Sequence, residues 1–412
     1  MRSSVLLSAQ VGTAHLEPAE DSTAVLSLDE GRVPFGRVEL TVPYDPATVG
    51  VLDPRDDPRL IVHLERRFSG SDPVSVLSAE FAGKKASDVS AAWAGLRAAD
   101  ITGRYGHPWN AFGFRATQRR RMDLSIRSRR VDHAAGTVAL VAATDEALLQ
   151  DYALLSATPI SPSVLTVRGA VELALSRAVP GAVLPGAEGA QTITAESAVW
   201  QPGVSAWDYL SSLTASAGLR LWCDEARVWH LAAPETIITP GQVSLAADQS
   251  VTAATDTISR DESLWADGVV VTYTWTDASN VRQVRHDVAG DANASRVLHV
   301  ELNRPYPRAG EAAARLRKLR ALGRVLDVEA VADPSVYPAM AASLTVPGTP
   351  LQSGWVSSVT WRVPEDRMTV TTRELIDVPT TAWAFLPAGI AWNKSPVGVS
   401  WLDPDPDPAE VA

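Results

Sequence analysis

The segment from Val204 to Leu231 constrains the fold most, because one short stretch of sequence encodes a helix, a helix stop and a hairpin. Ser205 can cap a short helix, and Gly218 suits the left-handed residue that ends one. Four apolar residues fall on a single face of that helix: Trp207, Leu210, Leu213 and Ala217. The ranges 219–223 and 228–231 then form two strands joined by a tight turn. The segment therefore predicts a small α/β unit, and it holds no catalytic signature.

Strand patterns dominate on both sides of this unit. Before it, short apolar runs bounded by Gly, Pro or Asp predict strands at 23–28, 37–42, 59–65, 112–115, 124–131 and 137–142. After it, the same pattern returns at 268–275, 281–286, 296–301, 325–332, 343–346, 354–362 and 368–374. Short strands at this density are typical of a barrel or a sandwich.

Helical periodicity appears mainly between these β regions. Thr144 is an expected N-cap for a helix over 144–155, and a second helix is expected over 167–178. A basic helix is also expected at 311–324. We therefore divide the chain into a β domain at 1–143, an α/β domain at 144–262, a second β domain at 263–378 and an irregular extension rich in Trp and Pro at 379–412.

Charge and cysteine content exclude several classes of protein. The chain carries 37 basic and 48 acidic residues, a net charge of -11, whereas a dedicated DNA-binding protein is usually basic. The single cysteine, Cys223, excludes an intrachain disulfide and is expected to be a small core residue. The sequence shows neither the apolar core of a signal peptide nor a run long enough to span a membrane. We expect a soluble protein made in the cytoplasm, with no stable membrane insertion.

Known catalytic motifs are missing from the sequence. The seven histidines lack metal-ligand spacing, and neither a phosphate-binding glycine loop nor a G-x-S-x-G element is present. Acidic residues cluster in two places, in the segment DPRDDP at 53–58 and at Asp224 and Glu225. Both clusters are better explained as residues that favour turns than as a glycosidase pair or a calcium loop. We predict no catalytic residue, no cofactor and no metal site.

Two groups of residues are candidates for interaction. An arginine-rich run covers 115–130 and includes Arg119, Arg120, Arg121, Arg127 and Arg129. It fits either DNA phosphate binding or an exposed strand face that pairs with acids of a neighbouring subunit; the net negative charge favours the second. In the extension, Trp383, Trp392 and Trp401 are interpreted as anchors for a partner protein, with a carbohydrate-stacking platform as the alternative.

Three segments resemble the tail hub proteins of tailed bacteriophages, the minor tail proteins. The first is LSIRSRRVDHAAGTVALVAATDEALLQDYAL at 124–154, which is similar to a passage in the hub proteins of phages that infect actinobacteria. The second is the segment at 204–231, and the third is GWVSSVTWRVPEDRMTVTTREL at 354–375. The resemblance spans about residues 1–378. It implies two β-barrels separated by the α/β domain, with the helix at 311–324 in the second, and a homotrimer at the virion tail tip with a lumen for the genome.

The resemblance also implies the partners: the distal tail protein, the tape measure protein, and other minor tail or receptor-binding proteins. No specific nucleic-acid binding is implied, although DNA passes through the lumen of such hubs. Some relatives carry fused peptidoglycan hydrolases, but the enzyme motifs of those extensions are missing here. We therefore expect a non-enzymatic structural protein. The alternatives are a receptor- or carbohydrate-binding tail protein and, less favoured, a wall hydrolase.

Overall fold

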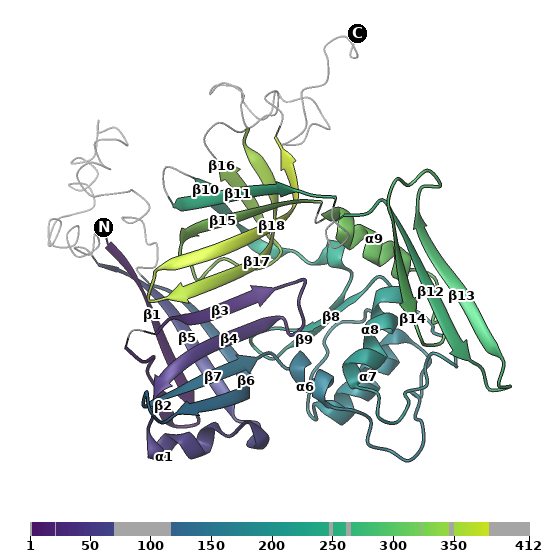
Figure 1. The fold of residues 1–412 in the computed structure, drawn as a ribbon, viewed down its shortest axis with the longest axis horizontal. Helices are drawn as coiled ribbons and strands as arrows, with labels where there is room; N and C mark the ends of the chain where they lie inside the picture. Colours follow the sequence, from purple (N-terminus) through teal and green to yellow (C-terminus); the bar gives the residue numbers. More distant parts are fainter. Residues whose placement is uncertain are drawn as a thin grey trace, which may run out of the picture.

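A single large sheet forms the body of the molecule. The computed structural model describes residues 2–20, 22–69, 117–246, 250–260, 265–321, 323–345 and 350–378 (Figure 1). The large sheet has 13 strands, and two smaller sheets of three and two strands lie beside it. The prediction of a mainly β protein is confirmed.

The first part of the chain supplies seven strands, which we call the N-terminal lobe. They are β1 (Arg2–Val11), β2 (Ala14–Leu16), β3 (Ala24–Asp29), β4 (Gly36–Pro43), β5 (Arg59–Ser69), β6 (Thr117–Asp132) and β7 (Thr137–Ala143). In β4, Val38, Leu40 and Val42 are buried while their neighbours face outward, as the period of a strand requires. Short helical turns follow β4: α1 (Pro46–Val49), η1 (Gly50–Leu52) and η2 (Pro54–Asp56). The spatial order in this lobe is β3-β4-β7-β6-β5-β1-β2.

The later β region supplies the C-terminal lobe. Its strands are β10 (Thr239–Ala246), β11 (Val251–Ile258), β15 (Arg324–Val331), β16 (Met340–Thr345), β17 (Gln352–Val363) and β18 (Arg367–Asp377). The sequence analysis placed residues 239–258 in the α/β domain, but β10 pairs with β16 and β11 pairs with β15. One hydrophobic core runs through both lobes.

Strand β17 joins the two lobes into one sheet. It pairs with β18 along its length, with β16 through residues 352–355 and with β3 through residues 358–363. The edge of β3 that a closed N-terminal barrel would need is therefore occupied by β17. Among the described strands, the path from β11 to β2 does not return on itself. The prediction of two closed barrels is wrong, because the two β regions satisfy their edges against each other.

The α/β unit has a core of its own. It contains α6 (Glu146–Asp151), α7 (Val167–Ala178), α8 (Ala206–Ser216), β8 (Arg220–Cys223) and β9 (Trp229–Ala232), and the turn η3 (Pro234–Thr236) follows. Ser205 Oγ accepts a hydrogen bond from Asp208 N at 3.0 Å, and Gly218 has a φ of +69°. Cys223 is fully buried. The helix, stop and hairpin at 204–231 are thus confirmed.

A three-stranded sheet with one covering helix completes the described chain. The strands β12 (Gly268–Thr276), β13 (Arg282–Gly290) and β14 (Val297–Leu302) pack against α9 (Glu311–Ala321). Asp287 Oδ2 accepts from the backbone N–H groups of Gly310 and Ala312 at 3.0 and 2.9 Å, which fixes where α9 begins. Buried Glu311 accepts from Ser212 of α8 and Tyr273 of β12, so α9 is bonded to the α/β unit.

Several local predictions need correction. Thr144 does not cap α6, because its hydroxyl is bonded instead to the backbone N–H of Gly36 at 3.0 Å. The helix expected over 144–155 spans only Glu146–Asp151, and the one expected over 311–324 ends at Ala321. The strand expected at 112–115 and the whole extension at 379–412 lie outside the described residues.

Candidate functional site

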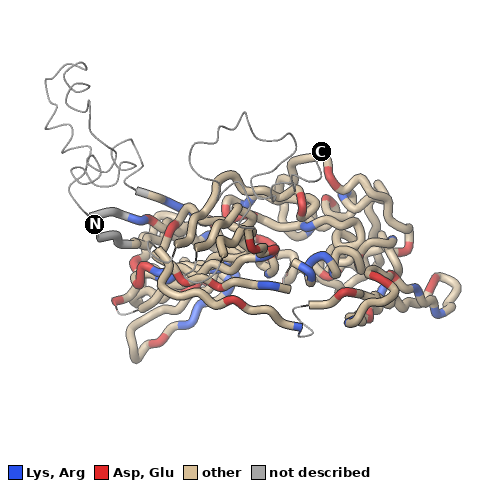
Figure 2. The backbone as a smooth tube through the Cα atoms, turned by 90° about the horizontal axis from the view of Figure 1, so that it is seen from above, with Lys and Arg blue, Asp and Glu red and all other residues tan. Residues whose placement is uncertain are grey.

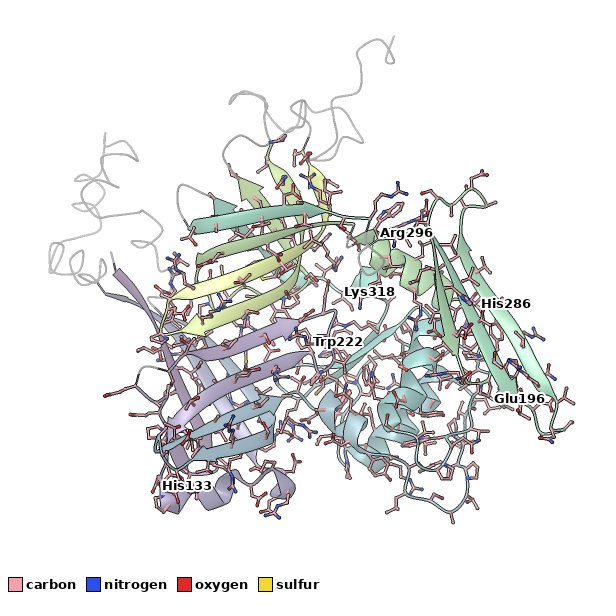
Figure 3. All side chains as sticks on the ribbon, in the orientation of Figure 1. His133, Glu196, Trp222, His286, Arg296 and Lys318 are labelled. Atoms are coloured by element: carbon pink, nitrogen blue, oxygen red, sulfur yellow. The ribbon has the colours of Figure 1, made fainter. Side chains whose placement is uncertain are left out.

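The β8–β9 hairpin lies between the large sheet and the core of the α/β unit. Residues on one face of the hairpin are buried in the α/β core: Leu221, Cys223, Trp229 and Leu231. The opposite face carries Arg220, Trp222 and His230, with the Trp222 ring stacked on His230 at 4.8 Å between centroids. Trp222 also packs against the core of the large sheet, and Figure 3 shows it in that position. The hairpin is thus the bridge between the two cores.

The turn of this hairpin contacts both lobes. The Glu225 carbonyl accepts from Asp123 N of β6 at 2.8 Å. Its carboxylate accepts from Arg120 Nη1 of β6 at 2.6 Å and from the Tyr337 hydroxyl, between β15 and β16, at 2.8 Å. The Arg120 guanidinium also lies 4.8 Å from the centre of the Tyr337 ring. Burial and the nearby Glu225 carboxylate raise the pKa of Tyr337, so its hydroxyl remains a donor.

A buried carboxylate ties the start of α6 to the same turn. Asp145 Oδ1 pairs with Arg59 of β5 at 2.7 Å, and Asp145 Oδ2 pairs with Arg227 of the turn at 2.9 Å. The Asp145 side chain is 2% exposed. Arg59 also pairs with Asp123 at 3.0 Å. One carboxylate therefore links a strand of the large sheet, a helix of the α/β unit and the hairpin turn.

The next residue, Glu146, is also buried. Its Oε1 accepts from the backbone N–H groups of Cys223 and Phe35 at 3.0 and 3.3 Å. Its Oε2 is buried and makes no hydrogen bond with the residues that the structure describes. Burial is the main cause that raises the pKa of Glu146, and these hydrogen bonds oppose the shift only in part.

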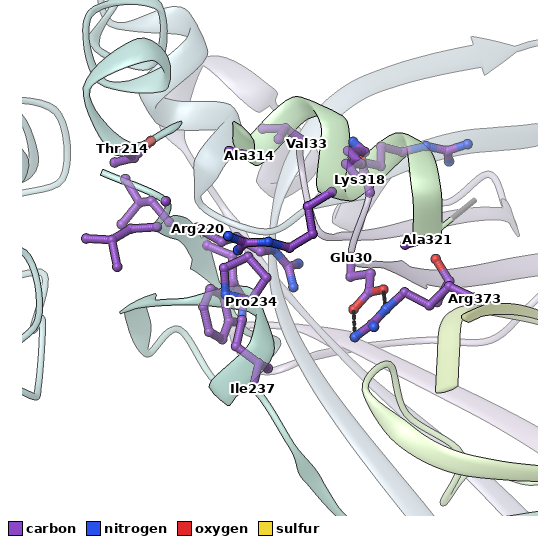
Figure 4. Close-up of a pocket in the computed structure, with 18 of the residues that line it drawn as sticks. Glu30, Val33, Thr214, Arg220, Pro234, Ile237, Ala314, Lys318, Ala321 and Arg373 are labelled. Carbon is purple, nitrogen blue, oxygen red and sulfur yellow. Dashed lines mark hydrogen bonds and ion pairs between the residues drawn. The ribbon is translucent and has the colours of Figure 1, made fainter. Parts of the chain in front are cut away.

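A cavity of 310 Å³ lies beside strand β8 of the hairpin, where residues 218–222 line it, and we call it the junction pocket. Segments from all parts of the molecule line it: the loop at 30–33, helices α8 and α9, strand β8, the loop at 234–237 and strands β17 and β18 (Figure 4). Trp207, Leu219, Trp222 and Ile237 contribute apolar wall. The pocket is therefore a meeting point of elements that are distant in sequence.

The polar groups of the junction pocket are unevenly paired. Arg373 is hydrogen-bonded to Glu30, and Arg317 pairs with Glu235 at 2.7 Å. Burial raises the pKa of Glu30, while Arg373 opposes the shift. Lys318 Nζ donates to the Gly31 carbonyl at 3.2 Å. Nη2 of Arg220 is buried without a hydrogen-bond partner among the described residues.

The arginines that the sequence analysis selected all have partners within the chain. Arg119 pairs with Glu65 at 3.3 Å, Arg121 with Asp123 at 3.2 Å, and Arg127 with Asp151. Arg129 donates to the Val49 carbonyl, and Arg120 bonds to Glu225 as described above. A bulge between Ile126 and Ser128 breaks the register between β6 and β7. Binding of these arginines to DNA or to a neighbouring subunit stays a prediction.

The three tryptophans of the extension, Trp383, Trp392 and Trp401, lie outside the described residues. Sequence reasoning missed the residues that meet at the hairpin, above all Asp145, Arg220 and Glu225. It interpreted Glu225 as turn chemistry. One available signal was the position of adjacent acids inside an otherwise apolar run, LVAATDEALL at 140–149, because apolar flanks favour burial.

The described part of the chain shows neither a cluster of metal-ligating side chains nor a membrane-spanning helix. There, no three His, Cys, Asp or Glu side chains gather as a metal site would require. None of the helices in the described ranges has the length and hydropathy needed to cross a membrane. Acidic and basic residues are interspersed along the backbone rather than separated by sign (Figure 2).

The fold is similar to those of solved tail proteins. No family model matches the sequence, and no curated protein does. The tail protein from Neisseria meningitidis MC58 aligns over 90% of this chain and 97% of its own, with 14% identity and a TM-score of 0.53. This chain shares the fold of a tail protein. The 43 kDa tail protein of prophage MuSo2 from Shewanella oneidensis aligns over 89% of this chain and 97% of its own, with 11% identity and a TM-score of 0.54.

Proposed function

We propose that this chain is a structural component of a bacteriophage tail tip, a hub that joins the tail tube and distal tail ring to the central fibre or receptor-binding components. The observation that carries the proposal is the shared fold with two tail proteins over 90% and 89% of this chain. In each comparison the alignment also covers 97% of the other protein. The likeness therefore extends over the whole architecture rather than one common motif.

The second support is the way the chain fixes its parts relative to one another. A hub needs surfaces at constant angles, because its neighbours bind several of them at once. Here β17 connects the two lobes through backbone pairing, and Asp145 and Glu225 bond the hairpin turn to the large sheet. In the proposed trimer, two lobes per chain supply six lobes around a lumen, which matches a six-fold tube to a three-fold tip.

The proposed mechanism is geometric rather than catalytic. Edge strands and sheet faces pair between subunits, while Trp383, Trp392 and Trp401 anchor a neighbouring tail protein. The expected neighbours are the distal tail protein, the tape measure protein and receptor-binding components. Zymography against host cell walls tests the opposing hypothesis of a hydrolase, and we expect no clearing.

The copy number in the virion tests the hub assignment directly. A particle reconstruction of the tail tip should show three copies of this chain in a ring around the lumen. Six copies would indicate a distal-tail ring instead. Absence of the chain from purified particles would contradict any structural role in the virion.

The extension is tested by truncation. Removing residues 379–412 should leave a folded protein, because the cores described above lie entirely within residues 5–378. The truncated chain should enter tail tips less efficiently, as measured by its abundance in purified particles. Normal incorporation would contradict the anchoring role of Trp383, Trp392 and Trp401.

A further inference from the structure

We propose that the junction pocket binds an acidic, proline-containing segment, and that its occupant is residues 402–410 of this chain, with the sequence LDPDPDPAE. This assignment does not depend on the role in the tail tip. It rests on the unpaired charge in the pocket, on the apolar walls, and on where the chain leaves the described structure.

The unpaired charge comes mainly from Arg220 and Lys318. Five cationic side chains line the pocket, Arg32, Arg220, Arg317, Lys318 and Arg373, against two carboxylates, Glu30 and Glu374. Arg317 and Arg373 have carboxylate partners, whereas Lys318 reaches only a carbonyl. Arg220 lies between the rings of Phe35 and Trp222, at 5.3 and 4.7 Å from their centres, and its Nη2 is left without a hydrogen bond.

A buried guanidinium nitrogen without a hydrogen-bond acceptor is costly, so its presence beside a cavity indicates a site for an anion. A carboxylate is well matched to a guanidinium, which can donate two parallel hydrogen bonds to it. Burial lowers the pKa of Arg220, and the nearby Glu30 and Glu146 carboxylates oppose that shift only in part, so an incoming carboxylate would oppose it further.

The walls of the pocket favour a ligand that also has apolar groups. Trp207, Trp222, Pro234 and Ile237 line it. In residues 402–410, Asp403, Asp405 and Asp407 alternate with prolines. Proline rings can pack on the aromatic walls, and a proline-rich chain loses little conformational entropy on binding, because it is already extended.

The chain leaves the described structure close to this pocket. Strand β18 contributes Arg373 and Glu374 to the wall, and the description ends at Val378. Residues 379–402 lie between that point and Asp403. Such a stretch of chain can extend over roughly 80 Å, so it reaches the pocket from β18 of the same copy with length to spare.

A peptide of residues 402–410, labelled with fluorescein, provides the first test. The host is the full-length chain with its own acids neutralised as D403N, D405N, D407N and E410Q, so that the pocket is vacant. We expect saturable binding, measured by fluorescence anisotropy, and weaker binding to the unaltered chain, whose own segment competes. A peptide with Asn and Gln at the acidic positions should bind about tenfold more weakly.

Variants of the host locate the site. Arg220→Met and Lys318→Gln should each weaken peptide binding by about tenfold, whereas Arg177→Gln, on the exposed end of α7, should leave it unchanged. Arg317→Gln is the matched control inside the pocket, and because Arg317 already pairs with Glu235, a change of less than about threefold is expected. Absence of saturable binding, or undiminished binding by both Arg220→Met and Lys318→Gln, would overturn the proposal.

A disulfide test examines the segment within the full-length chain. Ala314→Cys combined with Ala409→Cys leaves the charges of the pocket and of the segment in place, and this pair should form a disulfide under mild oxidation. The native Cys223 is buried and does not compete. Electrophoresis without reductant then separates a bond within one chain from a bond between two copies, and either result places the segment in the pocket. An equal yield when Arg177→Cys replaces Ala314→Cys would sink the proposal.

Discussion

The two ends of the β8–β9 hairpin differ in how their charges are satisfied. At the turn, Glu225 binds Arg120 and Tyr337, and Arg227 binds Asp145. At the other end, Arg220 has aromatic rings around it and no hydrogen bond at Nη2. We call the turn, with its bonded charges, the closed end of the hairpin, and the base around Arg220 the open end.

The difference indicates different tasks for the two ends. Removing one member of a buried, fully bonded group leaves its partners uncompensated, so such a group makes the arrangement of neighbouring elements rigid. A buried guanidinium nitrogen without a hydrogen bond costs stability in the free protein, and a bound ligand can supply the acceptor. We infer that the turn fixes the lobes, while the base of the hairpin is kept for binding.

The largest expected effect is at the turn, in Asp145→Asn. The substitution keeps the shape of the side chain but leaves Arg59 and Arg227 facing an uncharged amide. Because Asp145 is 2% exposed, we expect the free energy of unfolding to fall by about 3 kcal/mol in a denaturant titration.

A matched control for Asp145→Asn is Asp151→Asn, which removes the carboxylate paired with Arg127. The Asp151 side chain is 60% exposed, so a loss below about 1 kcal/mol is expected. Equal losses for the two variants would contradict the special position of Asp145.

A smaller effect is expected for Glu225→Gln. The variant weakens the hydrogen bonds to Arg120 and Tyr337 while it retains the length of the side chain. Arg120 belongs to the N-terminal lobe and Tyr337 to the C-terminal lobe. We expect a loss of about 2 kcal/mol in the free energy of unfolding. Glu235→Gln, at the half-exposed pair with Arg317, is the control. If the control loses as much stability, the turn does not hold the lobes more firmly than a surface pair does.

Individual helices and strands were predicted well from the sequence. The helix expected over 167–178 is α7 with the same bounds, and Thr166 caps it through a hydrogen bond from Gly169 N. The hairpin at 219–231 and the strands of both β regions are also present. Caps, helical spacing and strand alternation are short-range features, so the residues that decide them are neighbours in the sequence.

The pairing of β3 with β17 could not be read in this way. It joins residues such as Leu26 and Trp361, whose separation along the chain leaves no trace in any local pattern. The same limit applies to the candidate site. The sequence analysis named Arg120 as a candidate for interaction, and in the structure it bonds to Glu225, which is 105 positions away. No local pattern indicates this contact, and pairing of Arg120 with a neighbouring subunit stays a prediction.

The next prediction concerns pH and the buried Glu146, which lies between the two ends of the hairpin. Burial raises its pKa above the ordinary value of 4.5, so the native chain holds this proton at a pH where the unfolded chain has released it. Its contribution to stability is therefore fully present below about pH 4.5 and is lost as the pH rises through the native pKa. Glu146→Gln carries no titrating group at this position.

The stability of Glu146→Gln relative to the unaltered chain should therefore increase between about pH 5 and about pH 8, by on the order of 1 kcal/mol. Denaturant titrations of both proteins at the two pH values give this difference. A difference that stays constant, or that decreases as the pH rises, would show that Glu146 does not titrate as its burial requires.

The smallest expected effect is at the open end, in Arg220→Met. Methionine fills a similar apolar volume, so the variant removes an unpaired charge and the contacts of the guanidinium with Phe35 and Trp222. Relief of the buried charge and loss of those contacts act in opposite directions, and we expect the free energy of unfolding to change by less than about 1 kcal/mol. A loss as large as that of Asp145→Asn would mean that Arg220 has a structural partner, and the two ends of the hairpin would then be alike. A near-neutral change together with weaker binding of the acidic peptide would separate the two ends, because only a binding residue can lose its ligand while the fold retains its stability.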